Sequence, residues 1–210
     1  MISPIEIKEK KIILTEGTDV YYFSIWACRA FNVTGIQVLD FGGIKDLRKY
    51  LKALTLLPGY ENVETLLIAR DAETDSSAAV NSITTALREA SLPVPEKPCE
   101  FIGSTPKVAY MVFPGFMESP DGNRTLSTGT LEDLCLEIVK DDPIFECVEQ
   151  YVQCLQAKGP VARLHKTRLH TYLAGKNNFV GLKIGEAAKA GAWDWNHSKL
   201  VPFRQLILKM

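Results

Sequence analysis

The chain has 210 residues, of which 46% are hydrophobic, so it is long enough to bury the core of one domain of ordinary size. Its 24 basic and 25 acidic residues leave a formal net charge of -1. This balance excludes a strong overall attraction to nucleic acid or to an anionic membrane, so any such binding must come from a local patch.

The first half of the chain alternates between short apolar runs and amphipathic stretches, which is the pattern of βαβ units around a parallel sheet. This pattern predicts strands at residues 11–15, 35–41 and 64–70, followed by helices at residues 18–30, 45–56 and 77–90 respectively. Right-handed crossovers would bring the carboxyl ends of the three strands to one edge of the sheet, where ligands bind in open α/β sheets.

The second half begins after a proline-rich connection. A fourth strand is predicted at residues 107–113, with residues 100–103 as a shorter candidate strand. Residues 114–129 are dense in Gly, Pro, Ser, Asp and Asn, which predicts a surface loop rather than a regular element. Helical patterns then cover residues 130–139, 143–157, 161–174, 183–190 and 198–209.

These elements predict an α/β fold in which a parallel sheet is flanked by helices. Residues 1–125 would form the α/β core, and residues 126–210 would form a helical extension packed on it within a single structural domain. The apolar residues of the last helix suit either packing into this core or docking against a protein partner.

The five cysteines are odd in number and scattered, and no CxxC pair or Cys/His cluster has the spacing of a zinc site. The amino-terminal sequence lacks the basic-then-apolar order of a signal peptide, and no apolar run is long enough to span a bilayer. We therefore expect reduced cysteines, a cytoplasmic location and no membrane partner.

Acidic residues follow two of the predicted strands at the same edge of the sheet. Glu16 follows the first strand and precedes Gly17, and Asp71 and Glu73 follow the third. Magnesium is usually held by one or two carboxylates together with waters and substrate phosphate oxygens. The sequence therefore predicts a Mg²⁺ or Mn²⁺ site at this edge, suited to phosphoryl transfer at a nucleic-acid backbone.

A third acidic pair, Glu132 and Asp133, lies where the predicted loop meets the next helix. Two interpretations remain open for it. Glu132 would complete the metal site, or the pair would cap the helix, because Thr130-x-x-Asp133 has the spacing of a capping box. Acidic residues in a first helical turn also complement the helix dipole.

The sequence Gly42-Gly43-Ile44-Lys45 follows the second strand at the start of a helix. Free backbone N–H groups at a helix amino terminus favour phosphate, and a lysine adds a positive charge. A tight strand-to-helix turn would explain the same residues. Because this turn lies at the same sheet edge as Glu16, we expect Gly42, Gly43 and Lys45 to bind phosphate.

Six basic residues lie between Tyr151 and Gly185, where the sequence contains no Asp or Glu. Such a local excess suits contact with a phosphate backbone, although a solvated helix face is the more common meaning of a charge run. The three histidines form no HExxH or HxxxH set, and the GxSxG and GxxxxGK[ST] motifs are absent, so a zinc enzyme, a serine hydrolase and a P-loop ATPase are not indicated.

Together, the motifs at the sheet edge resemble the Toprim domain shared by topoisomerases, bacterial primases and the overcoming-lysogenization-defect (OLD) nucleases. The resemblance covers roughly the first half of the chain. It rests on an acidic, a glycine-rich and a second acidic motif after three successive strands: Glu16-Gly17, Gly42-Gly43 and Asp71-x-Glu73.

The segments Ser127–Leu134 and Trp193–His197 are similar to a small prokaryotic Toprim-like family without an assigned function. That match would cover nearly the whole chain. It implies a Toprim-like parallel sheet flanked by helices, with a helical carboxyl-terminal extension.

The resemblance also implies roles for individual residues. Glu16 would be a general acid/base or a metal ligand, and Asp71 and Glu73 would occupy the paired-aspartate motif that binds magnesium. Glu73 departs from the usual aspartate of that motif, and Asp75 could substitute for it. Lys166, by its position on a late helix, would correspond to the lysine that OLD-type sites pair with the acidic cluster.

We therefore expect a Mg²⁺-dependent protein that acts on phosphodiester bonds, most plausibly a nuclease with DNA or RNA as its substrate. Catalysis would fall to Glu16 and Lys166, and the metal would be held by Glu16, Asp71, Glu73 and Glu132. Two alternatives remain open. The chain would be a non-catalytic module that binds metal, phosphate or nucleic acid, or an interaction subunit with a protein partner or a second copy of itself.

Overall fold

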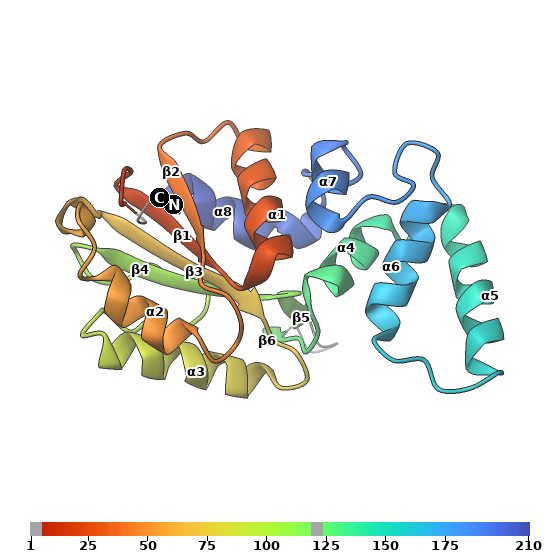
Figure 1. Cartoon of the computed structure of the whole chain (residues 1–210), viewed down its shortest axis with the longest axis horizontal. Coiled ribbons are helices and arrows are strands. Elements are labelled where there is room, and N and C mark those ends of the chain that lie inside the picture. Colours follow the sequence, from red (N-terminus) through yellow and green to blue (C-terminus); the bar gives the residue numbers. More distant parts are fainter. Residues whose placement is uncertain (1–5, 119–123) are drawn as a thin grey trace, which may run out of the picture.

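A parallel four-stranded sheet forms the centre of the computed structural model, which describes residues 6–118 and 124–210 (Figure 1). The sequence features expected at residues 1–5, and residues 119–123 of the expected loop, lie outside the described residues. The strand order is β2-β1-β3-β4. The strands are β1 (Lys11–Thr15), β2 (Ile36–Asp40), β3 (Thr65–Asp71) and β4 (Lys107–Phe113).

The strands in the middle of the sheet are apolar on both faces, as expected for a parallel sheet covered by helices on each side. In β3, every residue from Thr65 to Arg70 is buried, and Ile12, Ile13 and Leu14 of β1 are fully buried. All three pairings are parallel, with Thr15 opposite Asp40 on one side and Ala69 on the other. The predicted α/β fold is thus confirmed, and the carboxyl ends of the strands share one edge.

Because side chains alternate along a strand, the two faces of the sheet carry separate cores. Ile12, Leu14 and Ile68 pack beneath α2 (Leu47–Leu54) and α3 (Ser76–Glu89). Ile13 and Leu67 pack on the other face with α1 (Gly17–Ala30) and α8 (Val201–Lys209). Two short 3₁₀ turns occupy Tyr60–Asn62 and Ser198–Leu200.

Four further helices extend beyond the edge that carries the strands' carboxyl ends (Figure 1). They are α4 (Leu131–Val139), α5 (Ile144–Gln156), α6 (Leu164–Ala174) and α7 (Ile184–Lys189). Leu134, Leu169 and Ile184 join the same core cluster as α1, whereas α5 and α6 lie farthest from the sheet. The division of the chain at residue 125 stays a prediction.

The last helix packs into the core rather than presenting its apolar face. Leu200, Phe203, Leu206 and Ile207 are buried in the core cluster of α1, and Leu208 is 55% exposed. Phe203 also contacts the aromatic rings of Phe23 and Phe113. The apolar residues of α8 are therefore explained by core packing.

The prediction of an irregular loop at residues 114–129 was wrong in part. Two short antiparallel strands, β5 (Phe116–Glu118) and β6 (Arg124–Leu126), lie within that range. Each has only three residues, too few to show an alternating pattern in the sequence. The candidate strand at 100–103 is reduced to one antiparallel bridge between Ile102 and Val108.

All five cysteines carry free thiols, and burial raises the pKa of Cys28 to about 11 and of Cys99 to about 12. None of the helices formed by residues 6–118 and 124–210 has the length and apolar character needed to cross a bilayer.

Candidate functional site

A cavity of about 240 Å³ opens where β1, β2 and β3 end. Its other walls come from the start of α4 and one side of α6. Six of the eight predicted site residues line it: Glu16, Gly42, Gly43, Asp71, Glu132 and Lys166. The fold thus gathers side chains from positions 16 to 166 of the chain at one place.

A larger hollow of about 810 Å³ lies at the β4 edge, between α3, α8 and the β5–β6 pair. None of the eight predicted site residues lines it. Its charged side chains, from Glu96, Lys97, Glu100 and Arg124, are exposed. The larger volume therefore does not identify the functional site. Buried charged groups converge at the smaller cavity, which is the feature typical of functional sites.

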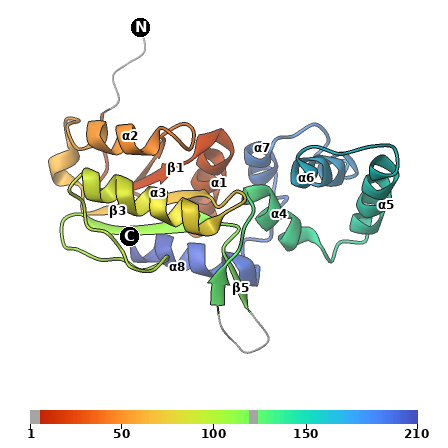
Figure 2. The ribbon, with the colours of Figure 1, turned by 90° about the horizontal axis from the view of Figure 1, so that it is seen from below.

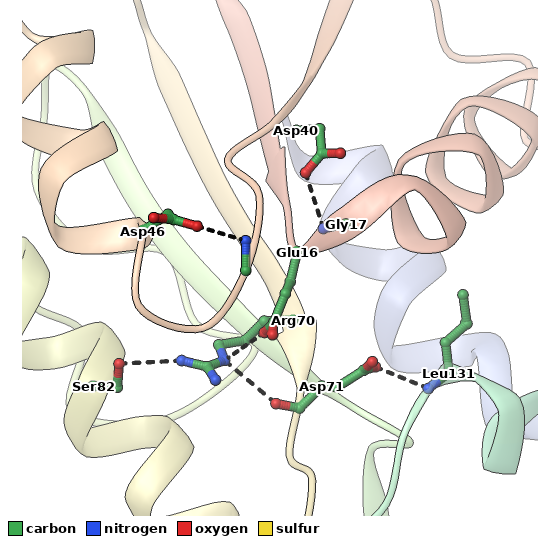
Figure 3. A network of polar contacts seen from close by, with 9 residues as sticks. Glu16, Gly17, Asp40, Asp46, Arg70, Asp71, Ser82 and Leu131 are labelled. Carbon is green, nitrogen blue, oxygen red and sulfur yellow. Dashed lines mark hydrogen bonds and ion pairs between the residues drawn. The ribbon is translucent and has the colours of Figure 1, made fainter. Parts of the chain in front are cut away.

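Glu16 and Arg70 form a buried ion pair at this cavity (Figure 3). Glu16 Oε2 lies 3.1 Å from Arg70 Nε, and the two side chains are 10% and 2% exposed. The geometry is not that of a hydrogen bond, and Glu16 Oε2 has no hydrogen-bond partner among the described residues. Burial raises the pKa of Glu16, while the Arg70 guanidinium opposes this shift and Glu73 and Asp40 add to it.

Arg70 is held by groups on two elements. Its Nη1 donates to Ser82 Oγ on α3 at 3.1 Å, and its Nε donates to the backbone carbonyl of Asp71 at 3.3 Å. Strand alternation explains its direction, because Arg70 shares the α2–α3 face with Leu66 and Ile68. The guanidinium is therefore fixed before any ligand binds.

Asp71 lies at the end of β3 and points toward the start of α4 (Figure 3). Its Oδ1 accepts the backbone N–H of Leu131 at 2.9 Å, one of the N–H groups that a helix leaves unpaired in its first turn. Burial, and then the nearby carboxylates of Glu132, Glu16 and Glu73, raise the pKa of Asp71 well above its ordinary value. The ionised carboxylate is therefore poorly compensated.

Glu132 and Asp133 turn out to have separate roles. Glu132 is 4% exposed and forms an ion pair with the ammonium of Lys166 from α6. Burial disfavours ionised Glu132, but Lys166 outweighs this effect and lowers the pKa of Glu132. Asp133 Oδ2 instead accepts the backbone N–H and the hydroxyl of Thr130, at 2.8 and 3.1 Å, so the capping interpretation is confirmed for Asp133.

Asp40 joins the two glycine turns of the site. Its Oδ1 accepts the backbone N–H of Gly17 at 2.9 Å and of Gly42 at 2.8 Å. Both glycines have positive φ, of 74° and 89°, which a residue with a side chain adopts only with strain. In the adjacent turn, Asp46 Oδ2 accepts the N–H of Gly43 at 3.0 Å. Both β-to-α turns are thus held by carboxylates, which orients the Gly42-Gly43 backbone at the rim.

Replacing Asp40 by alanine is expected to lower the free energy of unfolding by about 2–3 kcal/mol, because two hydrogen bonds to one carboxylate are lost. Chemical denaturation measures this change. Asp46→Ala is the matched control: it removes one such bond from an exposed carboxylate and should cost about 1 kcal/mol or less. Equal losses in the two variants would show that Asp40 does not hold the turns together.

Two of the predicted site residues lie outside the cavity. Glu73 is exposed and has φ +55°. Its backbone N–H donates to the carbonyl of Gly129, and its carbonyl accepts the N–H of Gly129. Its charge still raises the pKa of Glu16 and Asp71, so it lies close by. Lys45 is exposed in the turn before α2. Their roles in metal and phosphate binding stay predictions.

The carboxylates of the cavity suit a divalent cation of the magnesium class. In the described part of the chain, no three Asp, Glu, His or Cys side chains are close enough together to hold a metal ion by themselves. Magnesium does not require such a cage, since one or two carboxylates with waters and phosphate oxygens usually suffice. Asp71, whose ionised carboxylate is poorly compensated, and Glu16, which also lines the cavity, could supply two such carboxylates.

Three charged residues of this site were not predicted from the sequence. Asp40 has the same signal as Glu16 and Asp71, an acidic residue at the end of a strand, and could have been found by it. Asp19 lines the cavity from the first turn of α1, and burial, followed by Glu132, raises its pKa. Arg70 gave only a weak signal, a charged residue that ends an apolar run.

The comparisons with known proteins give a family and no activity. No curated protein and no solved structure matches the chain. One family model does match, described as a protein of unknown function (DUF3226), and it covers residues 10–210. The match therefore includes the sheet, the cavity and all of the carboxyl-terminal helices, and the chain belongs to the DUF3226 family.

Proposed function

We propose that this protein is a metal-dependent enzyme of the Toprim type that acts on phosphodiester bonds, as a nuclease would. The observation that carries the proposal is the convergence of Glu16, Asp71, Glu132 and Lys166 with the Gly42-Gly43 turn at one cavity. Phosphoryl transfer needs a metal, a positive charge near the phosphate and a group that moves a proton. Each requirement has a candidate residue at this cavity.

In this proposal, Asp71, with or without Glu16, holds a Mg²⁺ or Mn²⁺ ion. When bound, the metal polarises the phosphate and lowers the pKa of a water molecule. Glu16 would either ligate the metal or move a proton, and burial, which raises the pKa of Glu16, favours the uptake of a proton. Arg70 keeps that carboxylate in position, and the Gly42-Gly43 backbone offers a surface on which a phosphate can lie close to the chain.

Lys166 would act on the phosphate. Its ammonium is paired with Glu132, but the Lys166 side chain is only partly buried, at 39% exposed. A phosphate group that enters the cavity brings acceptor oxygens to the same ammonium, so Lys166 can share its charge between Glu132 and the substrate. The free thiols of the chain fit our proposal that it acts in the reducing cytoplasm.

The proposal is tested by metal binding and by cleavage. Thermal unfolding should be compared in EDTA and in Mg²⁺ or Mn²⁺, and cleavage of supercoiled, linear and single-stranded DNA and of RNA should be followed. Metal at a hundredfold excess over its dissociation constant should stabilise the protein by about 2.7 kcal/mol. Glu16→Gln should reduce this gain and lower the cleavage rate at least about a hundredfold.

Glu61→Gln serves as the control, because Glu61 is exposed and precedes β3, at the opposite end of the sheet. It should leave both metal binding and cleavage unchanged. Absence of any metal-dependent stabilisation would reject the proposal.

A second candidate function is a module that binds metal and phosphate without cleavage. It is favoured by one observation: Glu132, one of the predicted metal ligands, is already neutralised by Lys166. Fewer carboxylates then remain for a second metal ion. Metal-dependent stabilisation without cleavage of any of the four substrates would select this candidate over the enzyme.

A further inference from the structure

A chain of hollows leads away from the acidic cavity along α1. The cavity shares Thr18, Asp19 and Glu132 with a second hollow of about 280 Å³. That hollow in turn shares Thr18, Asp19 and Lys183 with a groove of about 470 Å³ between α1 and α7. A polymer lying in the groove would therefore reach the acidic cavity without leaving the protein surface.

The two helices that form this groove are packed in direct contact (Figures 1 and 2). A Cβ atom added at Gly185 of α7 would lie 2.3 Å from Tyr22 Cβ of α1, so only glycine permits this approach. The walls of the groove are therefore fixed relative to each other and to the strand β1 that precedes α1.

Aromatic rings and cations line the groove together. Trp26 is partly exposed, with the Arg29 guanidinium 4.3 Å and the Lys189 ammonium 6.0 Å from its ring centroid. Tyr22 is 47% exposed, although tyrosine carries a large apolar ring. Exposed rings beside cations are the arrangement on which unpaired bases stack while neighbouring phosphates meet positive charge.

The basic side chains of the groove outnumber its acidic ones. Arg29, Lys183 and Lys189 line it, and among the described residues none of the three forms an ion pair. The acidic residues of the groove are Asp19, nearest the cavity, and Glu186. Glu186 accepts the backbone N–H of Lys183 at 2.9 Å, so its carboxylate serves the start of α7.

The neighbouring helix α6 behaves differently. Its basic residues Lys166 and Arg168, and Lys176 just after it, are paired with Glu132, Glu149 and Asp142 respectively. Three of the six basic residues of the stretch seen in the sequence are therefore paired in the fold. Among the described residues, the cations of the groove, on α1 and around α7, form no such ion pairs.

We propose that the α1–α7 groove binds single-stranded nucleic acid, with bases stacked on Trp26 and Tyr22 and phosphates bound by Arg29, Lys183 and Lys189. The strand then runs past Asp19 into the acidic cavity. A duplex is excluded because its bases already stack on each other and cannot also stack on the groove's rings. This inference deepens the proposed function. The path of the strand into the acidic cavity rests on that function.

The test measures binding rather than cleavage, in EDTA and with Glu16→Gln as the parent protein. Fluorescence anisotropy should be recorded with labelled oligothymidylate, oligouridylate and a duplex of the same length. The single strands should bind more tightly than the duplex, and the preferred strand identifies the sugar. Trp26→Ala should weaken single-strand binding by roughly ten- to a hundredfold, as expected for loss of a stacked base.

Lys189→Ala provides a second variant on an exposed side chain, in case Trp26→Ala fails to fold. It should reduce the slope of log affinity against log salt by about 0.7, the value for one lost phosphate contact to a single strand. Lys158→Ala is the control, since Lys158 is exposed after α5 and does not line the groove. It should leave affinity and slope unchanged.

Unchanged single-strand binding in both groove variants overturns the proposal, as does a duplex that binds as tightly as the single strands. The proposal is also overturned if polyglutamate displaces the labelled strand as effectively as unlabelled oligothymidylate does. The groove would then recognise negative charge alone. If Mg²⁺-dependent cleavage occurs while the groove variants keep full strand affinity, only the groove assignment fails. If the groove binds strands but no cleavage occurs with metal, only the proposed enzyme fails.

Discussion

Replacing Arg70 by methionine is expected to lower the free energy of unfolding by about 3–5 kcal/mol. The substitution leaves the carboxylate of Glu16, which is 10% exposed, without the positive charge of Arg70, and an unpaired buried charge carries a cost of this size. The contacts of the guanidinium with Ser82 and with the Asp71 carbonyl are lost as well. Denaturation with urea, followed by circular dichroism, measures the change.

A double-mutant cycle separates the ion pair from the other contacts of Arg70. Arg70→Met combined with Glu16→Gln removes both charges, and a buried pair replaced by neutral groups is often close to neutral in stability. We therefore expect the double variant to recover most of the loss. Equal stability of Arg70→Met and the double variant would show that Arg70 acts through packing and Ser82, and not through Glu16.

The loss in Arg70→Met should also depend on pH. Burial raises the pKa of Glu16, and removing Arg70 removes the charge that opposes this shift. A carboxyl group with a raised pKa in the folded state costs nothing while it is protonated in both states. It destabilises the fold as pH rises from its ordinary pKa to the raised one, and the loss is constant above that. The variant should therefore lie closest to the wild-type protein at acidic pH and farthest from it at pH values above the raised pKa.

The sequence alone identifies Glu16 and Asp71 as members of one site. Their positions relative to the predicted strands are enough to place them together. Both follow a strand of the same parallel sheet, and parallel strands end at one edge. The local pattern also predicts the contact between Thr130 and Asp133, since a capping box involves residues three apart. Features of this kind need no knowledge of tertiary packing.

The assignment of Glu132 could not be settled in the same way. Glu132 and Asp133 are adjacent in a first helical turn, and whether either faces a cavity depends on how α4 meets the sheet. In the structure, the carboxylate of Glu132 accepts a hydrogen bond from Lys166, a residue 34 positions away on α6. Likewise, Arg70 ends an apolar strand, and only the packing of α3 and β1 shows that it faces Glu16. Such pairings are decided by tertiary structure.

Replacing Asp71 by asparagine is expected to stabilise the metal-free protein near neutral pH and to raise its melting temperature. The carboxylate is desolvated and lies among Glu132, Glu16 and Glu73, which together raise its pKa well above the ordinary value. An asparagine Oδ1 can still accept the Leu131 N–H, so the change removes the charge and keeps the hydrogen bond.

The pH dependence of this gain has a defined sign. Below pH 3.8, the ordinary value of Asp71, the carboxyl is protonated in both states and the gain should vanish. As pH rises, the unfolded chain ionises first and the folded wild-type protein loses stability relative to the variant. The gain therefore grows until pH exceeds the raised pKa and is constant above it. A variant whose advantage were largest at acidic pH would contradict this account.

Metal should reverse the order of the two proteins. In EDTA the asparagine variant melts higher, but saturating Mg²⁺ stabilises the wild-type protein by about 2.7 kcal/mol at a hundredfold excess over the dissociation constant and the variant by much less. Glu61→Gln is the control, because Glu61 is exposed and does not line the cavity. It should shift the metal-free stability little and keep most of the gain from metal. A full metal response in Asp71→Asn would remove Asp71 from the metal site. A reversal in the order of stability between EDTA and Mg²⁺ would show that the metal-free fold is destabilised by a carboxylate that binds the cation.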